Sequence, residues 1–220
     1  MPRRPVVGYT PVAGRPDDVP TPWRLRSVKL QPSGRVLHVP VDVRRLQQHH
    51  EPVRTQVELL VELLQRSFEP VAGDEWSREH SLLGNLATVR ETEFDRLPGH
   101  GVRTVRDIAH HVGGSYRVYA NQGWGDGALH YDRPGLLPSP QASQGSLELW
   151  LRSAFTEFIA ALGSVTDDAD LAALRQLPWG DRRPAGDIAR AMLQHTLYHA
   201  GEINHLRALL QGDDHWAWDT

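Results

Sequence analysis

The chain has 220 residues, 40% of them hydrophobic, a formal net charge of −3 at pH 7 and no cysteine. This length suits one sizeable domain with its own core, alone or with an appendage. Mixed charges without a basic field argue against nucleic-acid binding. The lack of cysteine excludes disulfides, thiolate catalysis and cysteine zinc sites, so any bound metal must use imidazole, carboxylate or water.

The first 22 residues are rich in proline, glycine and charge, and they carry neither a helical period nor a signal-peptide core. No apolar run reaches the roughly 20 residues that a bilayer span needs. We therefore expect a loose N-terminal arm on a cytoplasmic protein that does not contact membranes. The segments WRLRSVKL and RVLHVPVDV flank a Pro/Gly turn and predict a short β-hairpin, with Pro40 placing the second strand at an edge.

From residue 51 onward the pattern turns helical, which divides the chain into an N-terminal region over 1–50 and a helical bundle over 51–220. Pro52 suits the first turn of a helix that stops at Pro70. A second helix is predicted over about 75–95. Its apolar side chains face inward at Leu82, Leu83, Leu86, Val89 and Phe94.

Further helices are predicted to begin at Thr104 and at Ser146, each of which can cap a helix. A connection rich in glycine and proline separates these two helices. The last helix lies between Pro184 and Gly212. The fold class is therefore all-α: a four-helix bundle with one long crossover, preceded by an N-terminal extension with a short β-hairpin and an extra helix.

The most informative segment is ARAMLQHTLYHAGEINHLRALL in the last predicted helix. His195 and His199 stand one helical turn apart on the apolar face, so both imidazoles can point at one ion. Glu202 follows on the same face. Two histidines at this spacing also occur as satisfied core residues, so the pair needs a third ligand to indicate a metal.

The segment TVRDIAHHVGGSYRVYANQ offers that ligand. His111 lies beside the apolar stripe of the helix, whereas His110 points nearly opposite and is expected to be solvated. Taken singly, His111 could also be a helix-boundary histidine bonded to a carbonyl. Three inward histidines from two core helices would leave a coordination position open, as catalytic zinc sites do.

The pairing of TVRDIAHHVGG with MLQHTLYHAGEINHLRALL resembles the DinB/YfiT-like superfamily of metal-dependent bundle proteins, over roughly residues 74–212. His111, His195 and His199 occupy the places of the metal ligands in this resemblance. It implies a four-helix bundle, a divalent metal on three histidines and often a homodimer. For some relatives it implies thiol transfer or hydrolysis with small thiols such as mycothiol or bacillithiol.

An open metal position would activate a bound water or thiol as a nucleophile. Glu202 could accept a proton, orient a ligand imidazole, or be an ordinary helix carboxylate near Arg207. Tyr116 and Tyr119 could line the mouth of a substrate cavity, although aromatic residues at this spacing are usually core. Zinc is the first expectation for the metal, with nickel or iron as alternatives.

Several other features favour plain structural roles. His49 and His50 are adjacent, so they diverge on a helix and do not form a metal pair. His205 falls off the ligand face and is expected to be exposed, and Tyr198 is expected to be a packing residue. Trp216 and Trp218 are expected to plug the bundle end or a dimer contact. The loop around Trp124 and Tyr131 is long enough to act as a lid.

Two functions from different classes follow. The first is a metal-dependent enzyme, of thiol S-transferase or hydrolase type, that acts on a small electrophile. The second is a metal-stabilised bundle without catalysis that acts as a binding or interaction protein.

Overall fold

The computed structural model describes residues 28–30, 36–38, 55–101, 103–177 and 179–214. The chain forms two compact units, Met1–Val53 and Arg54–Thr220. In the first unit, strand β1 (Val28–Leu30) pairs antiparallel with β2 (Val36–His38), with Val28 opposite His38. The predicted hairpin is therefore confirmed. The expected N-terminal arm, His49 and His50, and Trp216 and Trp218 lie outside the described residues.

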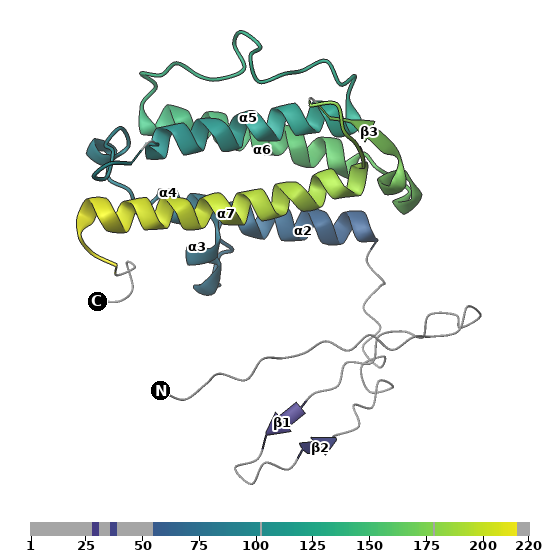
Figure 1. The fold of residues 1–220 in the computed structure, drawn as a ribbon, viewed down its shortest axis with the longest axis horizontal. Coiled ribbons are helices and arrows are strands. Elements are labelled where there is room, and N and C mark those ends of the chain that lie inside the picture. Colours follow the sequence, from purple (N-terminus) through teal and green to yellow (C-terminus); the bar gives the residue numbers. More distant parts are fainter. Residues whose placement is uncertain (1–27, 31–35, 39–54, 102, 178, 215–220) are drawn as a thin grey trace. The chain divides into compact units, whose positions relative to one another are not determined.

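The second unit is the predicted helical bundle. Its four long helices lie along a common direction (Figure 1). They are α2 (Gln56–Phe68), α5 (Val105–Trp124), α6 (Gln144–Gly163) and α7 (Ala185–Gln211). No helix among the described residues combines the length and apolarity that crossing a bilayer requires.

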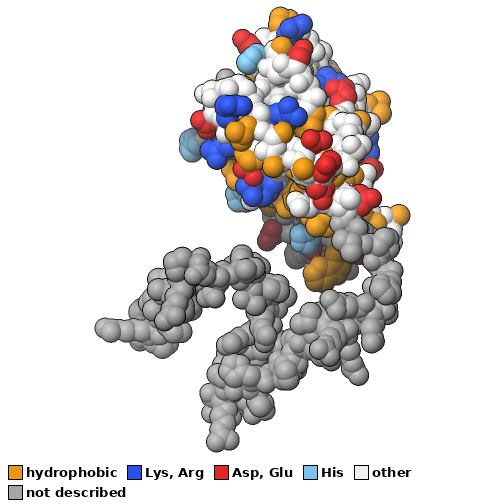
Figure 2. Space-filling model, turned by 90° about the vertical axis from the view of Figure 1, so that its right-hand side faces the viewer, with side chains coloured by type: hydrophobic (Ala, Val, Ile, Leu, Met, Phe, Trp, Pro, Cys, Tyr) orange, Lys and Arg blue, Asp and Glu red, His pale blue; other side chains and the backbone are white. Residues whose placement is uncertain are grey.

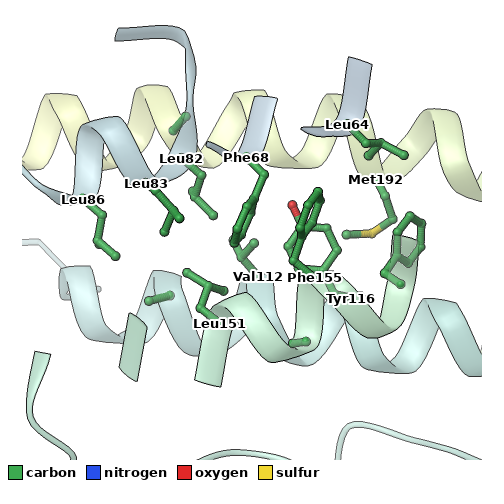
Figure 3. Close-up of a cluster of buried hydrophobic side chains, with 14 of the residues drawn as sticks. Leu64, Phe68, Leu82, Leu83, Leu86, Val112, Tyr116, Leu151, Phe155 and Met192 are labelled. Carbon is green, nitrogen blue, oxygen red and sulfur yellow. The ribbon is translucent and has the colours of Figure 1, made fainter. Parts of the chain in front are cut away.

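Helix α2 is one of these four, whereas the sequence favoured an extra helix ahead of the bundle. Its Leu64 and Phe68 side chains are 0% and 2% exposed, and they share one core with side chains of α5, α6 and α7 (Figure 3). Thr55 caps the helix in a reciprocal capping box with Glu58, so the helix begins after the predicted position of Pro52.

The prediction of a single helix over 75–95 is wrong. The segment forms α3 (Trp76–His80), α4 (Leu82–Leu86) and the 3₁₀ turn η1 (Glu91–Glu93). Ser81 interrupts it, because its backbone is extended and its hydroxyl accepts a hydrogen bond from the Gly84 amide. The five side chains that were predicted to face inward are nevertheless buried.

Helix α6 begins one turn earlier than predicted. Ser143, not Ser146, is its capping residue, and the Ser143 hydroxyl accepts a hydrogen bond from the Ser146 amide at 3.2 Å. The sequence also gave no sign of the small hairpin formed by β3 (Leu174–Gln176) and β4 (Arg182–Pro184), which follows the 3₁₀ turn η2 (Asp168–Ala172) and leads directly into α7.

Three aromatic contacts tie the bundle core together. Phe68 of α2 stacks on Phe155 of α6 with ring centroids 3.9 Å apart and an interplanar angle of 5°. Tyr116 of α5 packs edge-on against both rings and is completely buried. Its hydroxyl makes a 2.6 Å hydrogen bond with the Thr196 hydroxyl of α7. Since Thr196 donates to the Met192 carbonyl, Tyr116 is the donor in this pair.

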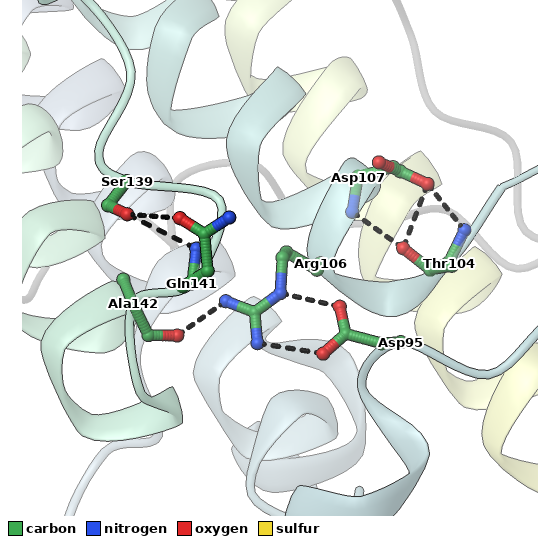
Figure 4. Close-up of polar contacts among 7 residues, drawn as sticks. All are labelled: Asp95, Thr104, Arg106, Asp107, Ser139, Gln141 and Ala142. Carbon is green, nitrogen blue, oxygen red and sulfur yellow. Dashed lines mark hydrogen bonds and ion pairs between the residues drawn. The ribbon is translucent and has the colours of Figure 1, made fainter.

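At the start of α5, Arg106 connects three segments (Figure 4). Its guanidinium donates to both carboxylate oxygens of Asp95, at 2.6 and 3.0 Å, and to the Ala142 carbonyl at 2.6 Å. Bidentate arginine–carboxylate pairs combine charge with fixed geometry. This contact therefore places the first turn of α5 relative to the segment before it and to the end of the crossover loop.

Replacing Gly113 with alanine should destabilise the bundle. An added Cβ would overlap the indole ring of Trp150, although alanine is the better helix former. Overpacking of this kind costs about 1–3 kcal/mol in the free energy of unfolding. Gly201→Ala is the matched control, because nothing lies near its Cβ position; it should be neutral or stabilising. Urea unfolding of both variants tests this, and equal stabilities would contradict the packing argument.

Replacing Glu93 with glutamine should lower stability in a pH-dependent way. The carboxylate is 2% exposed and accepts hydrogen bonds from Gln211 and from the Arg90 amide and guanidinium. Burial alone would raise the pKa of Glu93, but these contacts outweigh it and hold the pKa below 4.5. The contribution is therefore complete above the unfolded value and is lost as the pH falls through the lower folded value.

We expect Glu93→Gln to lose about 1–3 kcal/mol of unfolding free energy at pH 7. The difference from the wild type should shrink as the pH falls from 4.5 through the lower pKa of the folded protein, because only below that lower pKa is the wild-type carboxylate protonated in the folded state. Urea unfolding curves at neutral and acidic pH measure this. A difference that does not change with pH would exclude the electrostatic explanation.

Candidate metal centre

Helix α5 positions the first of the three histidines. Thr104 caps the helix, and its hydroxyl and the Asp107 carboxylate bond each other's backbone amides in a capping box (Figure 4). This fixes the helix start, so that His111 falls nearly two turns in. The prediction of Thr104 as the cap is confirmed.

Helix α7 positions the other two. It begins at Ala185 after Pro184, and it ends at Gly212, whose φ of 65° lies in the left-handed region that glycine tolerates best. His195 and His199 lie one turn apart near its middle. Both predicted ends of this helix are confirmed.

The structure brings the three imidazoles together, as predicted. The Nε2 atom of His195 lies 3.0 Å from Nε2 of His111 and 3.1 Å from Nε2 of His199. The three potential ligand atoms all lie within 4.8 Å of one another. His199 is 2% exposed, and the other two are half-buried. Convergence of three ring nitrogens from two helices forms a cluster that could hold a metal ion.

Hydrogen bonds among the three rings cannot satisfy all of their facing Nε2 atoms. An imidazole nitrogen carries either one proton or one in-plane lone pair. His195 Nε2 faces two other Nε2 atoms, so it cannot form a well-directed hydrogen bond with both. A cation would accept all three lone pairs at once. Tetrahedral zinc with nitrogen ligands at about 2.0–2.1 Å separates those nitrogens by roughly 3.3 Å, close to the observed spacings.

The electrostatics of the cluster keep the imidazoles neutral. Burial first, and then the neighbouring His199 and His111, lower the pKa of His195 to about 3. Burial first, and then His111 and Arg103, lower the pKa of His199 to about 4. Burial also lowers the pKa of His111. Neutral imidazole is the form that binds metals, so at neutral pH these rings present lone pairs without losing a proton.

Glu202 contacts one of these rings. Its Oε2 atom lies 2.7 Å from Nδ1 of His199, one turn back along α7. Since a carboxylate accepts, Nδ1 of His199 carries the proton and its Nε2 is left with the lone pair that faces the cluster. Of the roles considered for Glu202, this geometry favours the one that orients a ligand imidazole. By contrast, Nδ1 of His195 is buried without a hydrogen-bond partner among the described residues.

The buried bond between Tyr116 and Thr196 fixes α5 against α7 next to the cluster. Thr196 directly follows His195, and Tyr116 lies five residues after His111. Tyr116 therefore does not line the mouth of a cavity, as considered from sequence, but lies in the core. Burial raises its pKa well above the usual value for tyrosine.

Two exposed tyrosine rings lie next to histidines of the cluster. The ring of Tyr131 lies 6.5 Å from that of His111 at an interplanar angle of 19°, and the ring of Tyr198 lies edge-on to His199 at 4.9 Å. Tyr198 is 67% exposed, so its expected role as a packing residue is wrong. Tyr119 is half-buried; burial first, and then the neighbouring Tyr131, raise its pKa.

The crossover loop over 125–143 leads from the end of α5 back to the start of α6 (Figure 1), and hydrogen bonds tie it to α5. Tyr131 donates a hydrogen bond to the Ser115 hydroxyl at 3.0 Å, and Arg117 donates to the Leu136 carbonyl at 3.3 Å. The expectation of a lid rested on loop length alone. The structure instead shows a loop anchored on the helix that carries His111, and the loop brings Tyr131 against that histidine.

Two further histidines were assigned from helical periodicity. His205 is exposed, as predicted. His110 is not solvated: it is half-buried, its ring lies edge-on to Trp150 at 6.0 Å, and its buried Nε2 has no partner among the described residues. The outward face of α5 at this position is covered by α6, which a single-helix projection does not show. Trp124, which was assigned to the loop, is the last residue of α5.

Sequence reasoning missed the positions of Tyr131, Tyr198 and Arg103 at this site. Arg103 is exposed, and its charge contributes to the lowered pKa of all three histidines. No local pattern marks Tyr131, because it lies 20 residues after His111 and reaches it through the irregular loop that follows α5. Tyr198 could have been noticed as the neighbour of His199, but it lies off the ligand face.

The comparisons with known proteins agree with this architecture. The family model of the DinB superfamily matches residues 56–203, more than half of the chain. The chain belongs to the DinB superfamily. The match begins at the first residue of α2, whereas the resemblance noted from sequence began near residue 74. The matched region of this DinB-superfamily protein includes His111, His195 and His199. Searches of curated proteins and of solved structures found no significant match.

The contact between Glu202 and His199 predicts a specific tautomer. In the metal-free protein at neutral pH, His199 should carry its proton on Nδ1, and Glu202→Ala should abolish that preference because the acceptor is removed. Side-chain ¹⁵N–¹H correlation spectra distinguish the two tautomers. His205 is exposed on the same helix, so its signals should not change. A protonated Nε2 on wild-type His199 would contradict the geometry.

Proposed function

We propose that this protein is a divalent-metal-dependent enzyme in which His111, His195 and His199 hold one metal ion. The reaction is thiol S-transfer or hydrolysis on a small electrophile. The observation that carries the proposal is that Nε2 of His195 lies 3.0 Å from Nε2 of His111 and 3.1 Å from Nε2 of His199, with all three imidazoles neutral. Membership of the DinB superfamily supports it. Zinc is the metal we expect first, with nickel or iron as alternatives.

The donor set suits catalysis better than a purely structural site. Three protein ligands leave a position for water or substrate, whereas structural zinc is usually closed by four. A divalent ion bound there supplies Lewis acidity and lowers the pKa of a water or thiol toward neutrality.

The chain's own residues have separate tasks in this proposal. Glu202 positions His199 by accepting its Nδ1 proton, which directs the Nε2 lone pair into the cluster. The Tyr116–Thr196 bond holds the two ligand-bearing helices in register. Arg103 adds a positive charge near the cluster, which favours anionic groups such as a thiolate or a carboxylate at this place.

Metal content tests the first part of the proposal. Purified untagged protein should bind about one divalent ion per chain, measured by elemental analysis after dialysis. A ligand at 100 times its dissociation constant should stabilise the fold by about 2.7 kcal/mol. Replacing any of the three histidines with alanine should remove this stoichiometric metal and the stabilisation, because only two of the three protein ligands remain.

His205→Ala is the matched control, since His205 is exposed on the same helix. It should retain metal. Glu202→Ala should keep the site but weaken metal binding by roughly 10–100-fold, as is typical for partners of metal-bound histidines. Wild-type protein without stoichiometric metal would overturn the proposal.

A thiol-conjugation screen tests the catalytic part. Metal-loaded wild type should accelerate the consumption of a small electrophile, with either a small thiol or water as the nucleophile, and His111→Ala should not. Product analysis separates transfer from hydrolysis. A loaded protein without any metal-dependent turnover would favour the alternative of a non-catalytic, metal-stabilised binding protein. The cytoplasmic location, the homodimer and the identity of the thiol stay predictions from sequence.

A further inference from the structure

We infer that Tyr131 and Tyr198 form a recognition site for an aromatic group on the ligand that the histidine cluster binds. The inference rests on the proposed metal site and names its ligand class: a small molecule with a metal-binding polar end and a planar ring. The two tyrosines are specificity-determining residues in this proposal. Neither carries a metal-ligating role.

Four rings form a continuous row across the site. Tyr131 neighbours His111 at 6.5 Å, His111 neighbours His199 at 5.0 Å, and His199 neighbours Tyr198 at 4.9 Å. The two histidines in the middle of the row belong to the cluster, and a tyrosine stands at each end. A ligand held by the cluster is therefore within reach of both phenol rings.

The exposure of these rings indicates that they are available for a ligand. Tyr131 is 41% exposed and Tyr198 is 67% exposed, whereas His199 between them is 2% exposed. Aromatic rings release considerable free energy when buried, and they prefer to contact other aromatic rings in offset or edge-on geometry. Two partly exposed rings on either side of a polar cluster would gain this contact from an aromatic ligand.

The ring of Tyr131 is also held in place before any ligand arrives. The Tyr131 hydroxyl donates to the Ser115 hydroxyl, which donates to the His111 carbonyl at 2.7 Å. Tyr198 is on the regular helix α7, next to His199. A preorganised wall loses little conformational entropy on binding, so more of the contact energy appears as affinity.

The test compares two chelating probes on metal-loaded protein. Acetohydroxamate and benzohydroxamate share the same metal-binding end and differ in a methyl against a phenyl group. Affinities are measured by titration of the cobalt-substituted protein, followed through its visible spectrum. We expect benzohydroxamate to bind about three- to tenfold more tightly, the range that one favourable aromatic contact gives.

Variants assign this preference to the two tyrosines. Tyr131→Ala and Tyr198→Ala should each lower the ratio of the two affinities by the contact that its own ring makes, and the double variant should bring the ratio close to one, while acetohydroxamate binding stays within about twofold. Tyr131→Phe keeps the ring and should keep the ratio. Trp76→Ala is the control for nonspecific aromatic binding, since Trp76 is 78% exposed on α3. It should not change either affinity.

The outcomes separate this inference from the proposed function. Failure of the wild type to take up metal overturns both. Uptake of metal with tight acetohydroxamate binding but equal affinity for the two probes overturns the inference alone. A preference for benzohydroxamate that persists undiminished in the variant lacking both tyrosine rings also overturns it. Because Tyr198 is exposed on a regular helix, Tyr198→Ala remains informative even if Tyr131→Ala disturbs the loop.

Discussion

The candidate site depends on the register between α5 and α7. His111 on one helix and His195 on the other meet at 3.0 Å through their Nε2 atoms. A slip of one residue along a helix moves a side chain by 1.5 Å and turns it by about 100°, which would separate the rings. The buried bond between Tyr116 and Thr196 crosses the same interface and opposes such a slip. The packing between α5 and α7 therefore also determines the geometry of the candidate site.

The fold also holds three imidazoles close together in a partly buried place. Burial and mutual proximity keep the imidazoles neutral, with the pKa of His195 lowered to about 3. The Nε2 atom of His195 cannot make well-directed hydrogen bonds with both neighbouring Nε2 atoms, and its buried Nδ1 atom has no partner among the described residues; both are unfavourable in the metal-free chain. Local arrangements that reduce stability are typical of functional sites. The geometry of the cluster is compatible with a bound metal ion.

The sequence predicted best where a local rule had no competitor. The capping box at Thr104 and the glycine end at Gly212 depend on a few neighbouring residues, and both are confirmed. It predicted less well where two local signals competed. Ser81 breaks the helix expected over 75–95 because its hydroxyl offers the backbone another partner. At α6, both Ser143 and Ser146 could cap the helix, and the earlier one does.

Helical spacing alone determined that His195 and His199 share a face, and that His111 lies on the inward side of another helix. Those facts follow from the 3.6-residue period, which needs no tertiary information. The tertiary structure decided which groups surround them. Tyr131 reaches His111 through a loop tied to α5, and His110 is covered by α6. Such contacts depend on how helices and loops pack in three dimensions. The periodicity of one helix contains no information about which other segments lie beside it.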